Sequence, residues 1–201
     1  MDIEIGRSNV VEVYRALVGV IAPRPIAWVT TLNSNGSVNL APFSFFNIFG
    51  ANPPILVFSP TLRRDGSKKD TLRNLERTRE FVVNVATEEN AEAVNGSSSD
   101  LPPDESELAA LGLRASKSMR IKTPGVVESP VALECLVDRS SPSGTGALSA
   151  NLVIGEMTHI RIDDRVLGPD GRPDAALLRL IGRLGGDDFC RTTDIFSMLR
   201  P

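Results

Sequence analysis

The chain has 201 residues, of which 41% are hydrophobic and 23% are charged, and its net charge at pH 7 is −3. This length fits one domain, and acidic residues outnumber basic ones, 25 to 22, which argues against broad binding of nucleic acid. No apolar run approaches the roughly 20 residues that span a bilayer, and the first residues show no signal pattern. We therefore expect no membrane association and a cytoplasmic location.

The residue types that usually carry catalysis or bind metal are scarce. There are two cysteines, Cys135 and Cys190, and one histidine, His159, so no zinc site is expected. A hydrolytic triad has no support, and neither a Walker A nor a Gly-x-Gly-x-x-Gly sequence is present. We expect Cys135 to be a buried free thiol and His159 to be a strand residue with a satisfied hydrogen bond.

The N-terminal part predicts a short helix over residues 11–21 and then a β-hairpin over residues 26–41. Asn33-Ser34-Asn35-Gly36 suits the hairpin turn because Asn and Gly tolerate positive φ. Residues 42–54 are expected to be a loop, and residues 55–59 a short strand.

The expected loop is rich in aromatic residues, since four of the eight phenylalanines lie there: Phe43, Phe45, Phe46 and Phe49. Packing into the core explains such a group. A cover provided by a ligand or by a second subunit explains it equally, because a large exposed apolar patch is unusual on a monomer.

A helix is expected over residues 71–79, with Asp70 as its N-cap. Lys69 and Thr71 flank Asp70, and the free N–H groups of a helix start favour an anion such as a phosphate. An ordinary capped surface helix is the alternative interpretation of the same residues.

The remainder predicts a strand over residues 81–86, a helical insertion around residues 87–120, and strands over residues 131–138 and 148–163, the second bent near Gly155. A short helix over residues 175–181 precedes a Gly-rich tail. Strands with attached helices and no regular βαβ alternation predict one mainly β domain over residues 1–201, built as a β-barrel with helical additions.

Six segments carry a family resemblance: residues 23–31, 39–47, 64–74, 80–85, 129–135 and 182–186. In this order they resemble the flavin reductase-like family of FMN-binding split barrels, which includes flavoredoxin-type proteins and the reductase components of two-component monooxygenases. The resemblance runs from about Tyr14 to the C-terminus. It implies a split β-barrel of the Greek-key type and a homodimer with FMN at or near the subunit interface.

The resemblance also implies site residues by position. The ring and ribityl chain of FMN would lie against Ala27, Trp28, Val29, Thr30, Thr31, Asn39, Ala41, Pro42, Phe43 and Ser44. The phosphate would lie near Ser59, Lys69, Asp70 and Thr71. Arg183 would lie at the cofactor edge, and Phe189 stands where relatives often have Tyr.

The function implied is that of an oxidoreductase, an NAD(P)H-dependent flavin reductase that transfers hydride from the reduced nicotinamide to FMN. The alternatives are a flavoredoxin-type carrier that exchanges electrons with a protein partner, such as a monooxygenase, and a flavin-binding protein without a redox partner. A flavin carries the electrons itself, so few catalytic side chains are needed. Backbone N–H groups along residues 39–44 are expected to bond the flavin edges.

Overall fold

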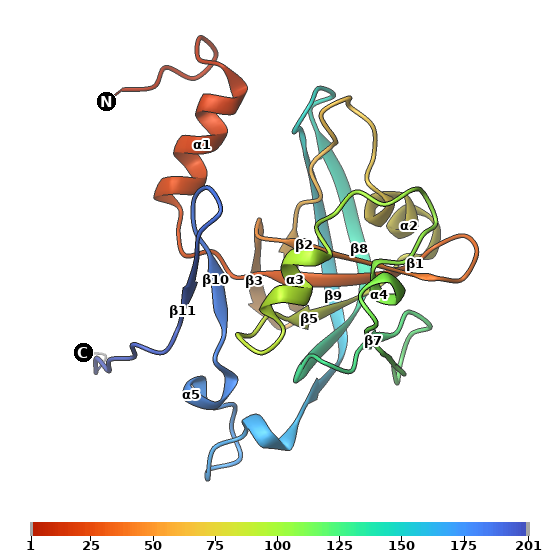
Figure 1. The fold of residues 1–201 in the computed structure, drawn as a ribbon, viewed down its shortest axis with the longest axis vertical. Coiled ribbons are helices and arrows are strands. Elements are labelled where there is room, and N and C mark those ends of the chain that lie inside the picture. The colour runs from red at the N-terminus through yellow and green to blue at the C-terminus, as the bar shows by residue number, and fades with distance from the viewer. Residues whose placement is uncertain (1, 200–201) are drawn as a thin grey trace.

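The structure is a computed structural model that describes residues 2–199. Seven strands form one antiparallel sheet in the order β2-β1-β5-β8-β9-β4-β3 (Figure 1). Their bounds are β1 Ala27–Leu32, β2 Val38–Phe43, β3 Phe46–Ala51, β4 Pro54–Phe58, β5 Glu80–Val85, β8 Val131–Ser143 and β9 Ala150–Ile162. The predicted mainly β architecture is confirmed.

The predicted N-terminal hairpin is β1 and β2, which pair along their whole length with Thr30 opposite Leu40. Gly36, at φ +85°, provides the turn between them. β1 also pairs with β5, so both of its edges are occupied. β1 is consequently an inner strand, whereas β2 ends the sheet.

The prediction of a loop over residues 42–54 is wrong, because Phe46–Ala51 forms the edge strand β3, which pairs with β4. Phe43 is buried in the core and Phe46 packs against it. Phe45 and Phe49 remain exposed. Core packing thus explains two of the four phenylalanines, and two still offer apolar surface.

β8 is longer than predicted, β9 is slightly shorter, and the two strands pair along almost their entire length. The expected irregularity near Gly155 has a steric cause. A Cβ at this position would lie 2.4 Å from the Phe81 ring, so only glycine lets the ring pack against β9. The register between the two strands shifts between Val137 and Arg139, next to this contact.

Both faces of the sheet are covered, and each has its own hydrophobic cluster. One cluster contains Ala27, Val29, Phe58, Phe81 and Cys135. The other contains Trp28, Leu40, Val94, Leu108 and Val126. Alternate residues of β1 therefore point into different clusters, and the strand is buried on both sides.

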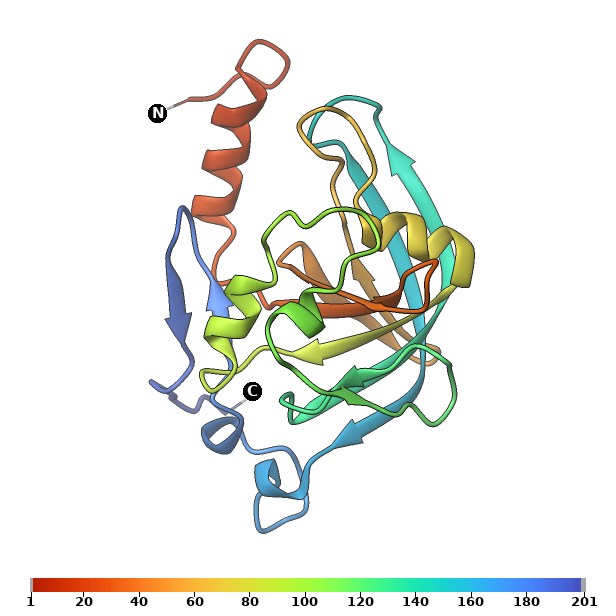
Figure 2. The ribbon, with the colours of Figure 1, turned by 45° about the vertical axis from the view of Figure 1, so that its right-hand side comes forward.

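Helices and small β-elements surround the sheet (Figure 2). The helical elements are α1 Val10–Val20, α2 Asp70–Thr78, α3 Ala91–Gly96, α4 Glu107–Ala110, the 3-10 turn η1 Asp164–Val166 and α5 Ala175–Leu178. The paired short strands are β6 Ala115–Ser116 with β7 Gly125–Val126, and β10 Ile181–Arg183 with β11 Phe189–Arg191. The helical insertion expected around residues 87–120 contains two short helices, α3 and α4.

α1 stands away from the sheet, with the β10–β11 hairpin at its foot (Figures 1 and 2). The buried Arg24 joins these parts, because its guanidinium donates to the carbonyls of Val18 and Ile21 at 2.6 Å each and of Leu184 at 2.9 Å. No helix within the described residues is both long and apolar enough to cross a membrane.

Candidate functional site

Two cavities meet at Pro42 and Ser98, and together they are called the joined cavity here. One end lies between β2, α3 and the β10–β11 hairpin; the other lies between β2, the start of α2 and the segment 97–100. Eight of the fifteen predicted site residues line it: Asn39, Ala41, Pro42, Ser44, Lys69, Asp70, Thr71 and Arg183. Segments far apart in sequence are thus brought to one place.

The start of α2 is an uncapped helix end that faces the joined cavity. Lys69 is the N-cap residue and its side chain makes no capping hydrogen bond. The N–H groups of Asp70 and Thr71 find no acceptor among the described residues. Free first-turn amides and the positive end of the helix dipole favour an anion. The prediction that Asp70 is the N-cap is therefore wrong.

Asp70 is the first residue of α2, and its carboxylate is occupied by two arginines. Arg63 donates to Oδ2 at 2.9 Å, and Arg73 donates to Oδ1. These ion pairs fix the loop that precedes α2 onto its first turn. They also explain why the carboxylate does not fold back to cap the helix.

Lys69 is a desolvated cation within the joined cavity. Burial lowers the pKa of Lys69 below its usual range, with Asp100 acting in the opposite direction. Its ammonium lies 5.6 Å from the centroid of the Phe43 ring and forms no ion pair with a described residue. A partly buried cation without a counter-ion is costly, so an anionic ligand would stabilise this arrangement.

A buried polar network holds Thr71 and β2 together. The Asn39 amide donates to Thr71 Oγ1 at 3.0 Å and to Thr31 Oγ1 at 3.2 Å. Asn74 donates to the same Thr31 oxygen at 3.1 Å. The Thr71 hydroxyl oxygen therefore accepts a hydrogen bond from Asn39, and its own proton is left to donate.

The other end of the joined cavity is formed around Arg183. Its guanidinium stacks on the Phe189 ring at 4.4 Å and donates to the carbonyl of Gly186 at 2.6 Å. Arg24 Nε donates to Ser44 Oγ at 3.3 Å just behind this end. Phe189, which lacks the hydroxyl of a tyrosine, thus serves as the platform that orients Arg183.

Seven predicted site residues do not line the joined cavity: Ala27, Trp28, Val29, Thr30, Thr31, Phe43 and Ser59. The five from β1 have no exposed surface at all. Phe43 packs on Phe58 in the core, and the Ser59 hydroxyl accepts from the N–H of Asn151 at 3.1 Å. A direct ligand contact remains only a prediction for these residues, and β1 offers no side-chain surface for one.

Backbone N–H groups along residues 39–44 were expected to bond the flavin edges, and for residues 39–43 this expectation is wrong. The N–H of Leu40 donates to Oε2 of Glu107 at 2.9 Å, on the side away from β1. Since successive pairs of an antiparallel ladder alternate, β1 takes the N–H groups of Asn39, Ala41 and Phe43. Pro42 has none. Strand β2 therefore faces the cavity with side chains and carbonyls.

Sequence reasoning missed the lining residues supplied by residues 87–120. Ser97, Ser98, Ser99 and Glu107 line the joined cavity, and Trp28 Nε1 donates to Ser97 Oγ at 2.9 Å, which fixes the serine segment. These residues lie in or beside the segment 95–99, within the expected helical insertion. Its only signal was its concentration of small polar residues.

His159 lies outside the joined cavity on β9. Its Nδ1 is 3.3 Å from Oε1 of the buried Glu134, but no hydrogen bond of acceptable geometry forms there. The predicted strand position of His159 is therefore confirmed, but the expected satisfied hydrogen bond is absent at Nδ1. Glu134 instead accepts from the N–H groups of Met119 and Arg120. Across residues 2–199, no group of three His, Cys, Asp or Glu is placed to hold a metal.

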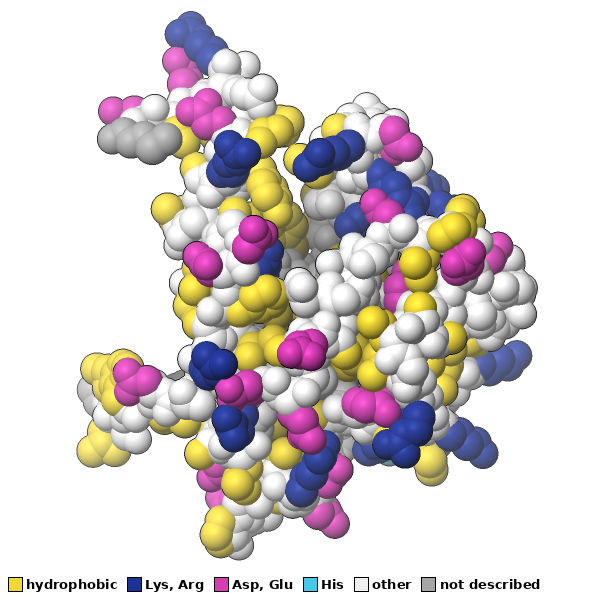
Figure 3. Space-filling view, viewed as in Figure 1, with side chains coloured by type: hydrophobic (Ala, Val, Ile, Leu, Met, Phe, Trp, Pro, Cys, Tyr) yellow, Lys and Arg dark blue, Asp and Glu magenta, His cyan; other side chains and the backbone are white. Residues whose placement is uncertain are grey.

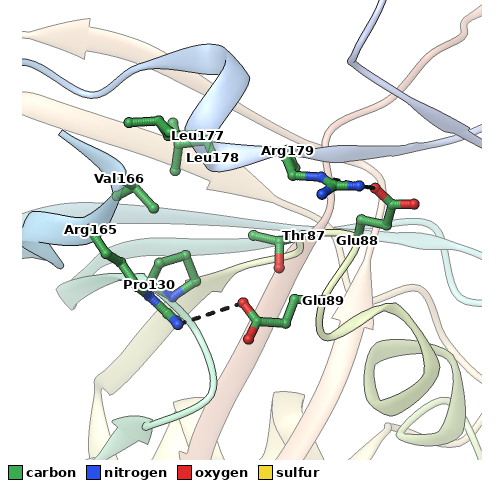
Figure 4. Close-up of a pocket in the computed structure, with 9 residues that line it drawn as sticks. All are labelled: Thr87, Glu88, Glu89, Pro130, Arg165, Val166, Leu177, Leu178 and Arg179. Carbon is green, nitrogen blue, oxygen red and sulfur yellow. Dashed lines mark hydrogen bonds and ion pairs between the residues drawn. The ribbon is translucent and has the colours of Figure 1, made fainter. Parts of the chain in front are cut away.

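A separate cavity of about 370 Å³ lies between the end of β5 and α5 (Figure 4). Two ion pairs border it, Glu89 with Arg165 and Glu88 with Arg179. Thr87 Oγ1 is buried there without a hydrogen-bond partner. None of the predicted site residues lines this cavity.

Comparison with known proteins identifies the family. The flavin reductase like domain matches residues 21–178. Nitrilotriacetate monooxygenase component B from Bacillus cereus is 34% identical, with 98% of each chain covered and a TM-score of 0.92. The 2-nitrobenzoate 2-nitroreductase of Pseudomonas fluorescens is 32% identical over 100% of this chain and 96% of that one, with a TM-score of 0.88.

A third structure shows the fold at greater distance. A protein with a split barrel domain from Shewanella frigidimarina is 20% identical, covers 100% of this chain and 99% of its own, and has a TM-score of 0.83. The fold is thus similar to that of split-barrel structures, and the resemblance seen in the sequence is confirmed. The chain belongs to the flavin reductase-like family.

Proposed function

We propose that this chain binds FMN in the joined cavity, with the phosphate at the start of α2. The observation that carries the proposal is the uncapped first turn of α2 beside an unpaired, desolvated Lys69. A phosphate dianion can accept hydrogen bonds from the two free N–H groups of Asp70 and Thr71, from the Lys69 ammonium and from the Thr71 hydroxyl. Their chemistry fits the phosphate of FMN.

The rest of the joined cavity offers space for the ribityl chain and the ring of FMN. Asn39, Ala41 and Pro42 of β2 connect the α2 end to the end near Ser44 and Arg183. The ribityl chain would follow β2, and the ring would lie toward Arg183. Ile26 and Val94 provide apolar surface at that end, which excludes water.

The activity we infer is reduction of FMN by NADH or NADPH. Bound FMN supplies the hydride and electron chemistry; the residues of the chain bind it, orient it and shield it. Similarity to a monooxygenase component and to a nitroreductase supports an oxidoreductase of this kind. A partner monooxygenase is part of the same proposal, supported by 34% identity to component B.

Two measurements on the purified protein test this function. The first is extraction of the bound ligand and mass analysis, for which we expect FMN; FAD alone, haem or pyridoxal phosphate would contradict the proposal. The second is anaerobic mixing with NADH and NADPH, for which we expect rapid bleaching of the flavin. Tight FMN without bleaching by either nucleotide would favour a flavoredoxin-type carrier.

We also propose a homodimer. α1 exposes Val10, Val11, Tyr14, Leu17 and Val20, and β3 exposes Ile48 and Phe49. Figure 3 shows apolar side chains along α1 beside the hollow that separates it from the body of the molecule. Tyr14 packs edge-on against Phe45 at 6.3 Å, so α1 and the exposed phenylalanines belong to one surface. Such a surface is typical of a subunit interface.

Sedimentation at micromolar protein tests the dimer. We expect twice the chain mass for the wild type and a shift to the chain mass for Leu17→Asp, which places a charge on the exposed side of α1. Glu12→Asp on the same helix is the conservative control. A monomeric wild type that binds FMN would contradict the dimer and leave the FMN site standing.

A further inference from the structure

Glu107 is a buried carboxylate that lines the α2 end of the joined cavity. It begins α4, and only 9% of its surface is exposed. Its Oε2 accepts from the N–H of Leu40 at 2.9 Å, which closes the free edge of β2. Asn39, Lys69 and Thr71 line the same cavity.

The second oxygen of this carboxylate has no partner on another residue. Within residues 2–199, Glu107 Oε1 accepts no hydrogen bond from a neighbouring residue and Glu107 forms no ion pair. Lys69, which lies in the same cavity, is also unpaired. A carboxylate oxygen that lines a cavity and accepts no hydrogen bond from another residue can accept one from a donor that enters the cavity.

The parts of FMN differ in what they offer to a carboxylate. A phosphate dianion only accepts hydrogen bonds and would be repelled, whereas a polyol offers hydroxyl donors. Glu107 lines the α2 end of the joined cavity with Asn39 and Ala41 of β2, and its Oε2 is bonded to β2 at Leu40. We propose that the carboxylate of Glu107 accepts a hydrogen bond from a hydroxyl of the ribityl chain. The inference rests on the proposed function.

The neighbouring residue Ser106 provides a control for a purely structural role of Glu107. Ser106 closes the same edge of β2, because its Oγ donates to the carbonyl of Val38 at 2.5 Å. Ser106 does not line the joined cavity. If α4 acts only as a cover for β2, then Ser106→Ala and Glu107→Gln will have similar effects on ligand binding.

The test is titration of apoprotein with three flavins: FMN, riboflavin, and lumiflavin, which lacks the polyol. Glutamine can still accept from Leu40 N–H but turns an amide donor toward the cavity. Glu107→Gln should therefore raise the dissociation constants of FMN and riboflavin about 10- to 150-fold, the loss of one charge-assisted hydrogen bond. Lumiflavin should be unchanged, and Ser106→Ala should leave all three unchanged.

Each other outcome has a definite meaning. Equal weakening of lumiflavin, or unchanged binding of riboflavin, would overturn the role of Glu107 while FMN binding itself stands. A wild type that binds none of the three flavins would overturn the proposed function together with this inference. Thermal unfolding of both variants, measured beside the titrations, shows whether α4 still packs on β2.

Discussion

Strand β1 and the start of α2 were both predicted to hold the cofactor, yet only the start of α2 lines the joined cavity. Residues 27–31 have no exposed surface, and both edges of β1 are paired. Residues 69–71 line a cavity, and the helix end there is uncapped. A family resemblance predicts which positions along the chain belong to the site. Whether a residue can touch a ligand depends on which neighbours cover it.

The difference gives the two regions separate physical roles. β1 is the inner strand that joins both hydrophobic clusters, so substitutions there should act on stability. The start of α2 carries an unpaired cation and free amides, so substitutions there should act on binding. The four predictions below test this division, from the largest expected effect to the smallest.

Trp28→Ala should cost about 3–5 kcal/mol of unfolding free energy, because it removes a fully buried ring and its bond to Ser97. Urea unfolding of the apoprotein measures this. The FMN dissociation constant of the folded fraction should change far less. An unchanged unfolding free energy with a large loss of FMN binding would show that Trp28 belongs to the site instead.

Lys69→Ala should weaken FMN about 10- to 150-fold and leave riboflavin nearly unchanged, because one charge-assisted hydrogen bond to the phosphate, about 1.5–3 kcal/mol, is lost. Lys68→Ala is the matched control: it removes the same charge from the adjacent residue, which pairs with Glu76 at 2.6 Å. Equal weakening of FMN and riboflavin binding by Lys69→Ala would mean that the lysine does not bind the phosphate.

Glu107→Gln should change how the stability of the apoprotein depends on pH. Burial raises the pKa of Glu107 above its usual value of 4.5, while the N–H of Leu40 acts in the opposite direction. The folded state then binds more protons than the unfolded state just above pH 4.5, so this group lowers stability as pH rises through that window. The melting temperature of the variant minus that of the wild type should therefore increase from pH 4.5 toward neutral pH. A difference that is flat or falls would contradict the burial of an ionised carboxylate.

Cys135 should resist alkylation in the native protein. It lies in the same cluster as Ala27 and Val29, and burial raises the pKa of its thiol well above its usual range. Cys190 is partly exposed. Iodoacetamide at pH 8 should therefore label one thiol per native chain and two after denaturation. Two labelled thiols in the native state would show that the core around β1 opens readily.

Much of this fold could be predicted because local signals agreed with the long-range packing. The β1–β2 hairpin follows from alternating residues around Asn-Gly, and α2 follows from Leu72 and Leu75 on one face. Strand β3 was missed because Asn47 and Gly50 interrupt its apolar run, and only pairing with β4 makes it a strand. The hairpin of β10 and β11 has strands of three residues, too short for any periodicity.

The candidate site could be predicted only where a single segment carries it. Lys69 and Thr71 were found because a helix start concentrates donors within three residues. The cap at Asp70 was wrong because Arg63 and Arg73 engage the carboxylate, and Arg63 reaches it from the preceding loop. Glu107 had no local signal at all. It reaches the cavity because α4 folds back over the edge of β2, 67 residues away in sequence.

The most direct test of the central claim is a crystal structure of the protein with FMN. We predict that the phosphate lies within hydrogen-bond distance of Lys69 Nζ and of the N–H groups of Asp70 and Thr71. We also predict that residues 27–31 make no contact with the flavin. A phosphate placed beside Arg183, or a flavin bound outside the joined cavity, would contradict the claim.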